Sequence, residues 1–235
     1  MSRIPVITID GPSGSGKGTI SRHLAQQLGW HFLDSGALYR LVGLGSARHG
    51  IANDNEAGLA DYARQLDVRF EAGDPEQEPV VFLENQDVTN DLRTETTGEL
   101  ASRVAAIPAV REALLARQRD FQQAPGLVAD GRDMGTTIFP GADLKIFLTA
   151  SAEVRAQRRY KQLKEKGNSV SLSALVQDIN QRDARDASRS VSPLVPADDA
   201  VIVDTSEMDI MQVMQRVQEL VHQVFPDARL GGLLA

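Results

Sequence analysis

The stretch Gly11-Pro-Ser-Gly-Ser-Gly-Lys-Gly-Thr19 decides the fold of this chain. It follows the apolar run Ile4–Ile9, which predicts a buried strand, and precedes Ile20–Leu28, which predicts a helix. Strand, glycine-rich loop, lysine and helix in this order predict a phosphate-binding loop, or P-loop. The glycines let successive backbone N–H groups turn toward phosphate oxygens, and the N-terminus of the following helix favours negative charge.

The lysine and threonine of this loop refine the prediction. Lys17 supplies a mobile positive charge for the outer phosphates of a nucleotide. The strict P-loop pattern has Ser or Thr directly after the lysine, whereas here Gly18 precedes Thr19. The extra glycine leaves open whether Thr19 meets a magnesium ion directly or through water. A flexible glycine turn is the alternative, but it explains neither the lysine nor the flanking strand and helix.

The composition is that of a globular protein. The 235 residues are 42% hydrophobic and 24% charged, which fits one or two domains with a full core. The absence of cysteine excludes thiolate metal sites and disulfides. A net charge of −7 argues against bulk nucleic-acid binding. The sequence shows no N-terminal signal segment and no apolar run of about 20 residues. We therefore expect a cytoplasmic protein that binds neither nucleic acid nor membrane.

Apolar runs alternate with helical patterns along most of the chain, which predicts an α/β fold with a parallel sheet. Five strands are predicted, at residues 4–9, 31–34, 126–130, 144–148 and 200–204. Helices are predicted at residues 20–28, 36–48, 151–166 and 209–224.

The segment 66–89 breaks this alternation. It predicts three short antiparallel strands, at 66–70, 80–84 and 86–88, with an acidic loop at 73–79 between the first two. Helices predicted at 94–106 and 108–123 return the chain to the core. We interpret residues 41–112 as an insert on the sheet edge and not as an independent domain.

A second motif, Asp34-Ser-Gly-Ala-Leu-Tyr-Arg40, follows the predicted strand 31–34. Ligands of parallel α/β sheets bind at the carboxyl ends of the strands. Arg40, one turn into the next helix, is therefore a candidate to hold a second phosphate. A capped helix with a surface Tyr-Arg pair is an equally good explanation of this motif alone.

A third motif, Asp130-Gly-Arg-Asp-Met-Gly135, follows the predicted strand 126–130. An acid at the end of an apolar strand in a P-loop protein commonly holds magnesium or its water shell, so we expect Asp130 to help place the metal. Arg132 and Asp133 follow in a loop flanked by glycines and are expected to face the same cleft. The alternative is a plain turn, because Asp-Gly is a strong turn signal.

Arginines gather in two further segments. Arg182, Asp186 and Arg189 are spaced so that one helix would present all three on one face. Arg158 and Arg159 lie on the helix predicted before it. Such spacing also produces surface salt bridges of small value. A phosphoryl-transfer site, however, needs several guanidinium groups around the migrating charge.

Taken in order, these motifs resemble those of the bacterial cytidylate (CMP) kinases, a branch of the P-loop nucleoside monophosphate kinases. The resemblance covers nearly the whole chain, including Val110–Leu115 and the three-stranded insert. It implies a P-loop three-layer α/β/α sandwich with a five-stranded parallel sheet. It also implies one kinase domain over residues 1–235, with a nucleotide-monophosphate (NMP)-binding insert at 41–112 and a short lid at 156–171.

The resemblance implies a role for each motif residue. The phosphates of ATP would be bound by Gly11, Pro12, Ser13, Gly14, Ser15, Gly16, Lys17, Gly18 and Thr19, with Arg158 and Arg159 on the lid. The CMP phosphate would be held by Arg40, Arg132 and Arg189, with Ser35 and Tyr39 nearby. The cytosine would be read by Ser102, Arg111 and Asp133, and the sugar would meet Arg182 and Asp186.

The implied reaction is transfer of the γ-phosphoryl group of ATP to CMP or dCMP by a monomer, with Mg²⁺ as cofactor. Lys17, Arg158 and the metal would stabilise the transferring group. A GTPase would share the P-loop but requires an Asn-Lys-x-Asp motif, which this sequence lacks. A small-metabolite kinase of the shikimate or gluconate kind would share the core, but such chains are shorter and lack the insert.

Overall fold

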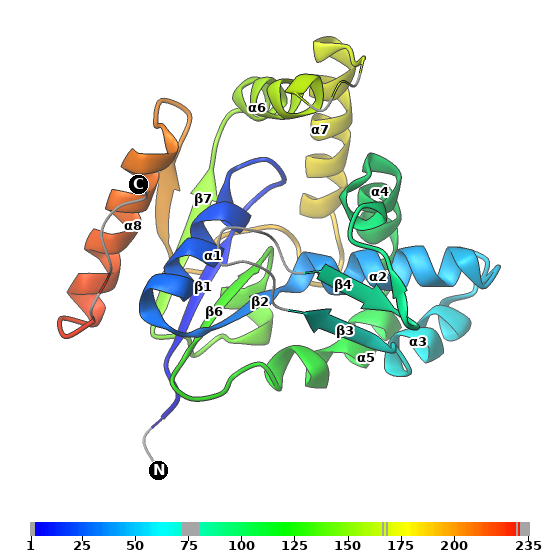
Figure 1. Cartoon of the computed structure of the whole chain (residues 1–235), viewed down its shortest axis with the longest axis horizontal. Helices are drawn as coiled ribbons and strands as arrows, with labels where there is room; N and C mark the ends of the chain where they lie inside the picture. Colours follow the sequence, from blue (N-terminus) through cyan, green and yellow to red (C-terminus); the bar gives the residue numbers. More distant parts are fainter. Residues whose placement is uncertain (1–2, 72–79, 166, 168, 229, 231–235) are drawn as a thin grey trace. The chain divides into compact units, whose positions relative to one another are not determined.

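The structure is a computed structural model that describes residues 3–71, 80–165, 167, 169–228 and 230. The acidic loop predicted at 73–79 lies outside the described residues. The chain divides into two compact units (Figure 1): unit 1 comprises Met1–Leu33 and Asp120–Ala235, and unit 2 comprises Asp34–Arg119. The second unit contains the segment 41–112 that we interpreted as an insert.

The central sheet of unit 1 confirms the predicted α/β class. Its strands lie in the order β2-β6-β1-β7-β8, and β1 pairs in parallel with both β6 and β7. All five strands were predicted, with bounds within two residues of those observed. They are β1 (Val6–Asp10), β2 (His31–Asp34), β6 (Leu127–Gly131), β7 (Leu144–Thr149) and β8 (Val201–Asp204).

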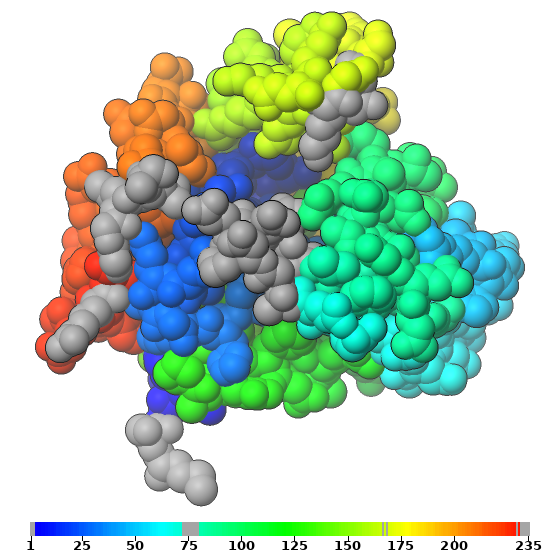
Figure 2. All heavy atoms as spheres, in the orientation of Figure 1, coloured from blue at the N-terminus to red at the C-terminus, as the bar shows by residue number. Residues whose placement is uncertain are grey.

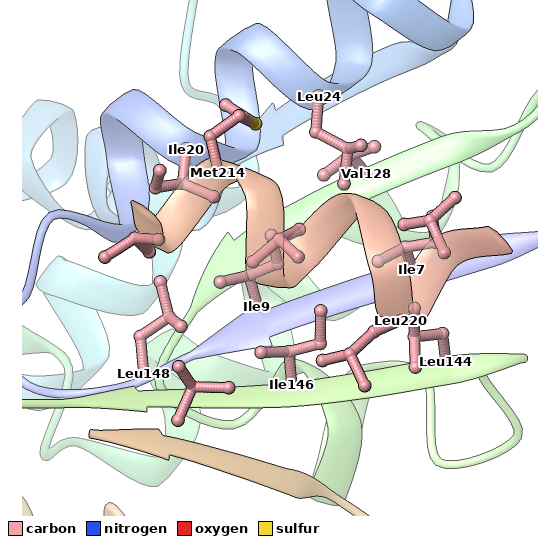
Figure 3. Packing of buried hydrophobic residues seen from close by; sticks show 14 of the residues in the cluster. Ile7, Ile9, Ile20, Leu24, Val128, Leu144, Ile146, Leu148, Met214 and Leu220 are labelled. Carbon is pink, nitrogen blue, oxygen red and sulfur yellow. The ribbon is translucent and has the colours of Figure 1, made fainter. Parts of the chain in front are cut away.

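One face of this sheet is covered by α1 (Lys17–Leu28) and α8 (Ile210–Val224). Figure 3 shows Ile7 and Ile9 of β1 packed with Leu24 of α1 and Leu220 of α8. These side chains are almost fully buried, so the hydrophobic effect fixes the start of the P-loop on a rigid strand. The outer side of α8, red in Figure 2, is polar and exposed.

The remaining helical elements of unit 1 follow β6 and β7. A five-residue π-helical turn, η2 (Met134–Ile138), lies against β1. After β7 come α6 (Ala152–Glu165) and α7 (Leu172–Ala187), which pack against each other and expose their outer sides (Figure 2). The predicted lid, 156–171, comprises most of α6 and the connection to α7; residues 166 and 168 lie outside the described part.

Unit 2 contains the three antiparallel strands predicted from the sequence. They form a sheet in the order β3-β4-β5, with bounds Val68–Glu71, Val80–Leu83 and Gln86–Asp87. Its helical elements are α2 (Ser35–Arg48), α3 (Glu56–Arg64), η1 (Asp91–Arg93), α4 (Glu95–Val104) and α5 (Pro108–Arg119). The helix α3 was not predicted.

Candidate functional site

The loop between β1 and α1 has the backbone that a P-loop requires. Gly11 has a φ of +149°, and a Cβ atom there would lie 2.0 Å from the carbonyl oxygen of Leu148, so no other residue fits. Gly16 occupies the N-cap of α1 with a φ of +90° and makes no side-chain cap. No side chain at the N-cap therefore competes for the first N–H groups of α1. These N–H groups can donate to an anion bound at this end of the helix.

Lys17 folds back over this loop. Its Nζ atom donates to the carbonyl oxygen of Pro12 at 3.2 Å and lies 3.9 Å from Oδ1 of Asp130. Both side chains are at most 10% exposed. The structure thus brings together a cation and a carboxylate that the sequence predicted for the same site. The hydroxyl of Ser15 is buried and has no hydrogen-bond partner within the described chain, so it could donate to a bound phosphate.

A second carboxylate, Asp10, was not predicted as part of the site. It ends β1, directly before Gly11, and its two oxygens accept the backbone N–H groups of Met134 and Gly135, each at 2.8 Å. Burial raises the pKa of Asp10 to about 7, although these two hydrogen bonds act in the opposite direction. The sequence signal that could have found it is an acid placed at the end of a mostly apolar strand.

Asp10 fixes the start of the turn that carries the third motif. Asp133 stands just before η2 and is 3% exposed, with a φ of −146°. Because Asp10 holds the next two backbone N–H groups, the P-loop strand and the loop after β6 are joined by hydrogen bonds. Asp130 and Asp133 are therefore both supported from β1.

Asp186 on α7 is a buried acid held by two arginines. Its Oδ2 atom accepts from Nε of Arg132 at 2.8 Å, and its Oδ1 atom is paired with Nη2 of Arg189. The side chain is 1% exposed. Burial alone would raise the pKa of Asp186, but the guanidinium groups of Arg132, Arg189 and Arg182 hold it below its ordinary value. These three arginines are among the candidates for binding the acceptor nucleotide.

The prediction that one helix carries Arg182, Asp186 and Arg189 was wrong for the last residue. Helix α7 ends at Ala187, and Ser188 is its C-cap. Arg189 therefore lies beyond the helix, and its side chain turns back onto Asp186. The helix thus ends two residues before Arg189, about half a turn earlier than the charge spacing alone indicated.

The arginines of α6 differ in their surroundings. Arg158 donates to the hydroxyl and the carbonyl oxygen of Thr205, at 3.1 and 2.6 Å, and to the carbonyl oxygen of Met208 at 3.3 Å. Arg159 donates to Gln162 at 3.4 Å in a solvent-exposed hydrogen bond. In this structure Arg158 therefore contacts the segment between β8 and α8. Arg182 lies 3.5 Å from the hydroxyl of Ser13 in the P-loop.

Unit 2 holds the other predicted site residues. Arg40 donates to the carbonyl oxygen of Leu92 at 2.6 Å, and the hydroxyl of Ser35 donates to Gln118 at 2.8 Å. The guanidinium of Arg111 lies 5.6 Å from the ring centroid of Tyr39, a cation–π distance. The further predicted residue Ser102 is 2% exposed on α4.

The described residues contain no group of three or more His, Cys, Asp or Glu side chains that could hold a metal ion. Magnesium commonly binds through one or two carboxylates together with substrate phosphates, and Asp130 is suitably placed beside Lys17 for that arrangement. Thr19 is exposed in the first turn of α1. Over the same described ranges, no helix is both long and apolar enough to cross a membrane.

Comparison with known proteins gives consistent matches over nearly the whole chain. The sequence model of the family described as cytidylate kinase matches residues 7–223. A cytidylate kinase of Pseudomonas entomophila is 58% identical over 217 residues, which cover 92% of this chain and 95% of that protein. A cytidylate kinase of Pseudomonas putida is 56% identical over 222 residues, or 94% and 97% of the two chains. Among solved structures, shikimate kinase from Bacteroides thetaiotaomicron matches with a TM-score of 0.45 and 15% identity, over 93% of this chain and 98% of that one.

Proposed function

Because the chain belongs to the cytidylate kinase family, we propose that it transfers the γ-phosphoryl group of ATP to CMP or dCMP, giving ADP and the diphosphate. The observation that carries this proposal is the position of Lys17 in a glycine loop at the N-terminus of α1, 3.9 Å from Asp130. A loop of this kind binds the outer phosphates of a nucleotide.

The donor is assigned to residues 11–19. Backbone N–H groups of the loop and the N-terminus of α1 would bind the β- and γ-phosphates, and Lys17 would neutralise charge on the transferring group. Mg²⁺, which supplies charge neutralisation when bound, would be held by the phosphates with Asp130, and by Thr19 directly or through water. Arg158 and Arg159 are assigned to the lid side of the donor; for Arg158 this requires release from Thr205.

The acceptor is assigned to side chains with matching chemistry. Guanidinium groups bind phosphate through paired N–H donors, so the CMP phosphate is assigned to Arg40, Arg132 and Arg189, with Ser35 and Tyr39 nearby. Ser102, Arg111 and Asp133 are assigned to cytosine, and Arg182 and Asp186 to the sugar. The Asp186 carboxylate would then exchange part of its contact with Arg132 and Arg189 for the nucleotide.

Catalysis in this proposal needs no covalent intermediate. An oxygen of the acceptor phosphate attacks the γ-phosphorus while the bond to the β-phosphate oxygen breaks, and the transferred group passes between two anions. Holding both nucleotides in line removes most of the entropic barrier. The positive groups around them offset the repulsion between the two sets of phosphates. We also propose that the protein is a cytoplasmic monomer.

The test is an assay coupled to ADP release, with ATP and one acceptor at a time. CMP and dCMP should be the best acceptors, ahead of UMP, AMP, GMP and shikimate. A preference for shikimate, or for a purine monophosphate, would contradict the proposal. ADP release that is equally fast without an acceptor would indicate an ATPase.

A further inference from the structure

A buried arginine, Arg155, lies directly beneath the tip of the P-loop. It sits on α6 and is 4% exposed. Its Nε atom donates to the carbonyl oxygen of Ala150 at 2.9 Å, and its Nη1 atom donates to the carbonyl oxygen of Ser13 at 3.1 Å. Gly14 has a φ of +78°, and a Cβ atom there would lie 3.2 Å from Cβ of Arg155. The loop tip therefore rests on this side chain.

A carboxylate on the next helix holds Arg155 in place. Asp183 of α7 accepts from Nη1 at 3.1 Å through Oδ1 and from Nη2 through Oδ2. A bidentate pair of this kind fixes the plane of the guanidinium as well as its distance. The Arg155 side chain is 5% exposed and that of Asp183 is 27% exposed, so the pair is only partly screened by water.

The contact between Arg155 and the carbonyl oxygen of Ser13 affects phosphate binding through the geometry of the peptide bond. The carbonyl oxygen of Ser13 and the N–H group of Gly14 belong to one trans peptide and point in opposite directions. A donor that holds the oxygen therefore directs the N–H group away from Arg155. In a P-loop, such N–H groups are the ligands of the nucleotide phosphates.

We propose that Arg155, held by Asp183, is a positioning residue that orients the Ser13–Gly14 peptide toward the phosphates of the donor nucleotide. This inference rests on the proposed function for the identity of the donor. Arg155 does not itself contact the nucleotide in this scheme. The pair also gives a role to Asp183, which lies in the arginine-rich segment Arg182–Arg189. No role was assigned to this residue from the sequence.

The experiment compares Arg155→Met, Arg155→Lys and Asp183→Asn with wild type. Arg155→Met keeps much of the side-chain volume but removes every donor. We expect it to raise the KM for ATP or lower kcat, so that kcat/KM for ATP falls about ten- to hundredfold, because small displacements of binding groups have effects of this size. The KM for CMP should change by less than about twofold. Arg155→Lys should recover part of the loss, since an ammonium can reach Ser13 or Asp183 but cannot make the fork.

A matched control is Arg216→Met on α8. Arg216 also pairs with a carboxylate, Glu219, at 3.0 Å, but both side chains are more than 40% exposed. This variant should leave the kinetics unchanged. Thermal unfolding of each variant checks the fold. If Arg155→Met does not fold, Asp183→Asn carries the test alone, because it keeps Arg155 and removes only the charge that fixes it.

Two results would overturn the proposal. One is unchanged kinetics in folded Arg155→Met or Asp183→Asn, and the other is an equal change in the KM values of both substrates. Binding of a fluorescent ATP analogue without acceptor separates this inference from the proposed function. If the wild type binds the analogue but does not phosphorylate CMP, the loss of analogue binding in Arg155→Met still decides the role of Arg155.

Discussion

Nε of Arg132 lies 2.8 Å from Oδ2 of Asp186, so a buried ion pair joins the loop after β6 to helix α7. Arg189 pairs with the other oxygen of the same carboxylate. One acid thus holds two cations that the proposed function assigns to the phosphate of the acceptor. In the structure, Asp186 orients both guanidinium groups and offsets one of their two positive charges.

The first prediction concerns Asp186→Asn. It keeps the shape of the side chain but leaves two buried guanidinium groups without their carboxylate. Breaking a buried pair in this way costs about 3–5 kcal/mol in the free energy of unfolding. Urea unfolding at neutral pH measures the loss. A change below about 0.5 kcal/mol, the range of ordinary surface substitutions, would show that the pair does not hold the loop to α7.

The same acid predicts a pH dependence. The pKa of Asp186 is lowered in the folded state, so its stabilisation is present above the pKa of the unfolded chain and is lost as pH falls through the folded value. Wild type should therefore lose more stability than Asp186→Asn as pH falls below about 4.

Asp10 is expected to behave in the opposite sense. Burial raises its pKa to about 7, so the folded protein keeps a proton that the unfolded chain releases near pH 4. The contribution of this group to stability therefore decreases as pH rises from about 4 to about 7. Asp10→Asn should flatten the dependence of the free energy of unfolding on pH in that interval. The upper limit of the effect is about 4 kcal/mol, since one pKa unit corresponds to about 1.4 kcal/mol.

Asp204→Asn is a control for the Asp10 variant. Asp204 is exposed at the end of β8, and hydrogen bonds from Ser206 lower its pKa, so it titrates outside the interval from about pH 4 to about pH 7. Its removal should leave the slope in that interval unchanged. Equal slopes for wild type and Asp10→Asn would mean that Asp10 is ionised throughout.

Another prediction concerns Lys17→Met. The substitution retains the aliphatic part of a side chain that is 10% exposed and removes its charge. Turnover with ATP and CMP should fall to less than about a tenth of wild type, because charge contacts to a transferring group supply several kcal/mol in the transition state. Circular dichroism checks the fold. Turnover above that level in the folded variant would contradict the P-loop assignment of Lys17.

A further prediction concerns the choice of base. Cytosine presents an amino group that can donate a hydrogen bond to the Asp133 carboxylate. Uracil presents a carbonyl oxygen at the same position, which cannot donate one. An unpaired buried polar group costs about 1–3 kcal/mol, so CMP should be preferred over UMP by roughly tenfold to several hundredfold. Asp133→Asn offers an amide donor and should narrow this ratio, mainly through loss of activity with CMP. The values of kcat/KM for both acceptors test it. If the ratio of kcat/KM for CMP to that for UMP does not change, Asp133 does not recognise the base, and Ser102 and Arg111 would be assigned this role.

The sequence predicted the elements whose signal is local. Runs of β-branched residues such as Val6-Ile-Thr-Ile9 identified the strands, and glycine spacing identified the P-loop. Helix α3 was missed because the residues it buries are few and mostly small: Leu59, Ala60 and Ala63. Its N-cap, Asn55, accepts from the N–H of Gly58 at 2.9 Å, a signal that could have located the start of the helix.

The contacts that orient the site could not be predicted in the same way. Arg155 is 142 positions from Ser13 and 28 from Asp183, and no local pattern relates them. Asp10 likewise meets Met134 and Gly135 only because β1 and β6 are neighbours in the sheet. The motifs supplied the candidate site residues, whose roles stay predictions, while the residues that support them became visible only in the folded arrangement.

The most direct test of the proposed reaction follows the phosphoryl group itself. The protein is incubated with ATP labelled with ³²P at the γ-position, CMP and Mg²⁺, and the nucleotides are separated. The label should appear in CDP, and Lys17→Met should reduce this transfer to less than about a tenth. Label released only as inorganic phosphate, or label that remains in ATP while CMP is unchanged, would contradict the proposed transfer to CMP.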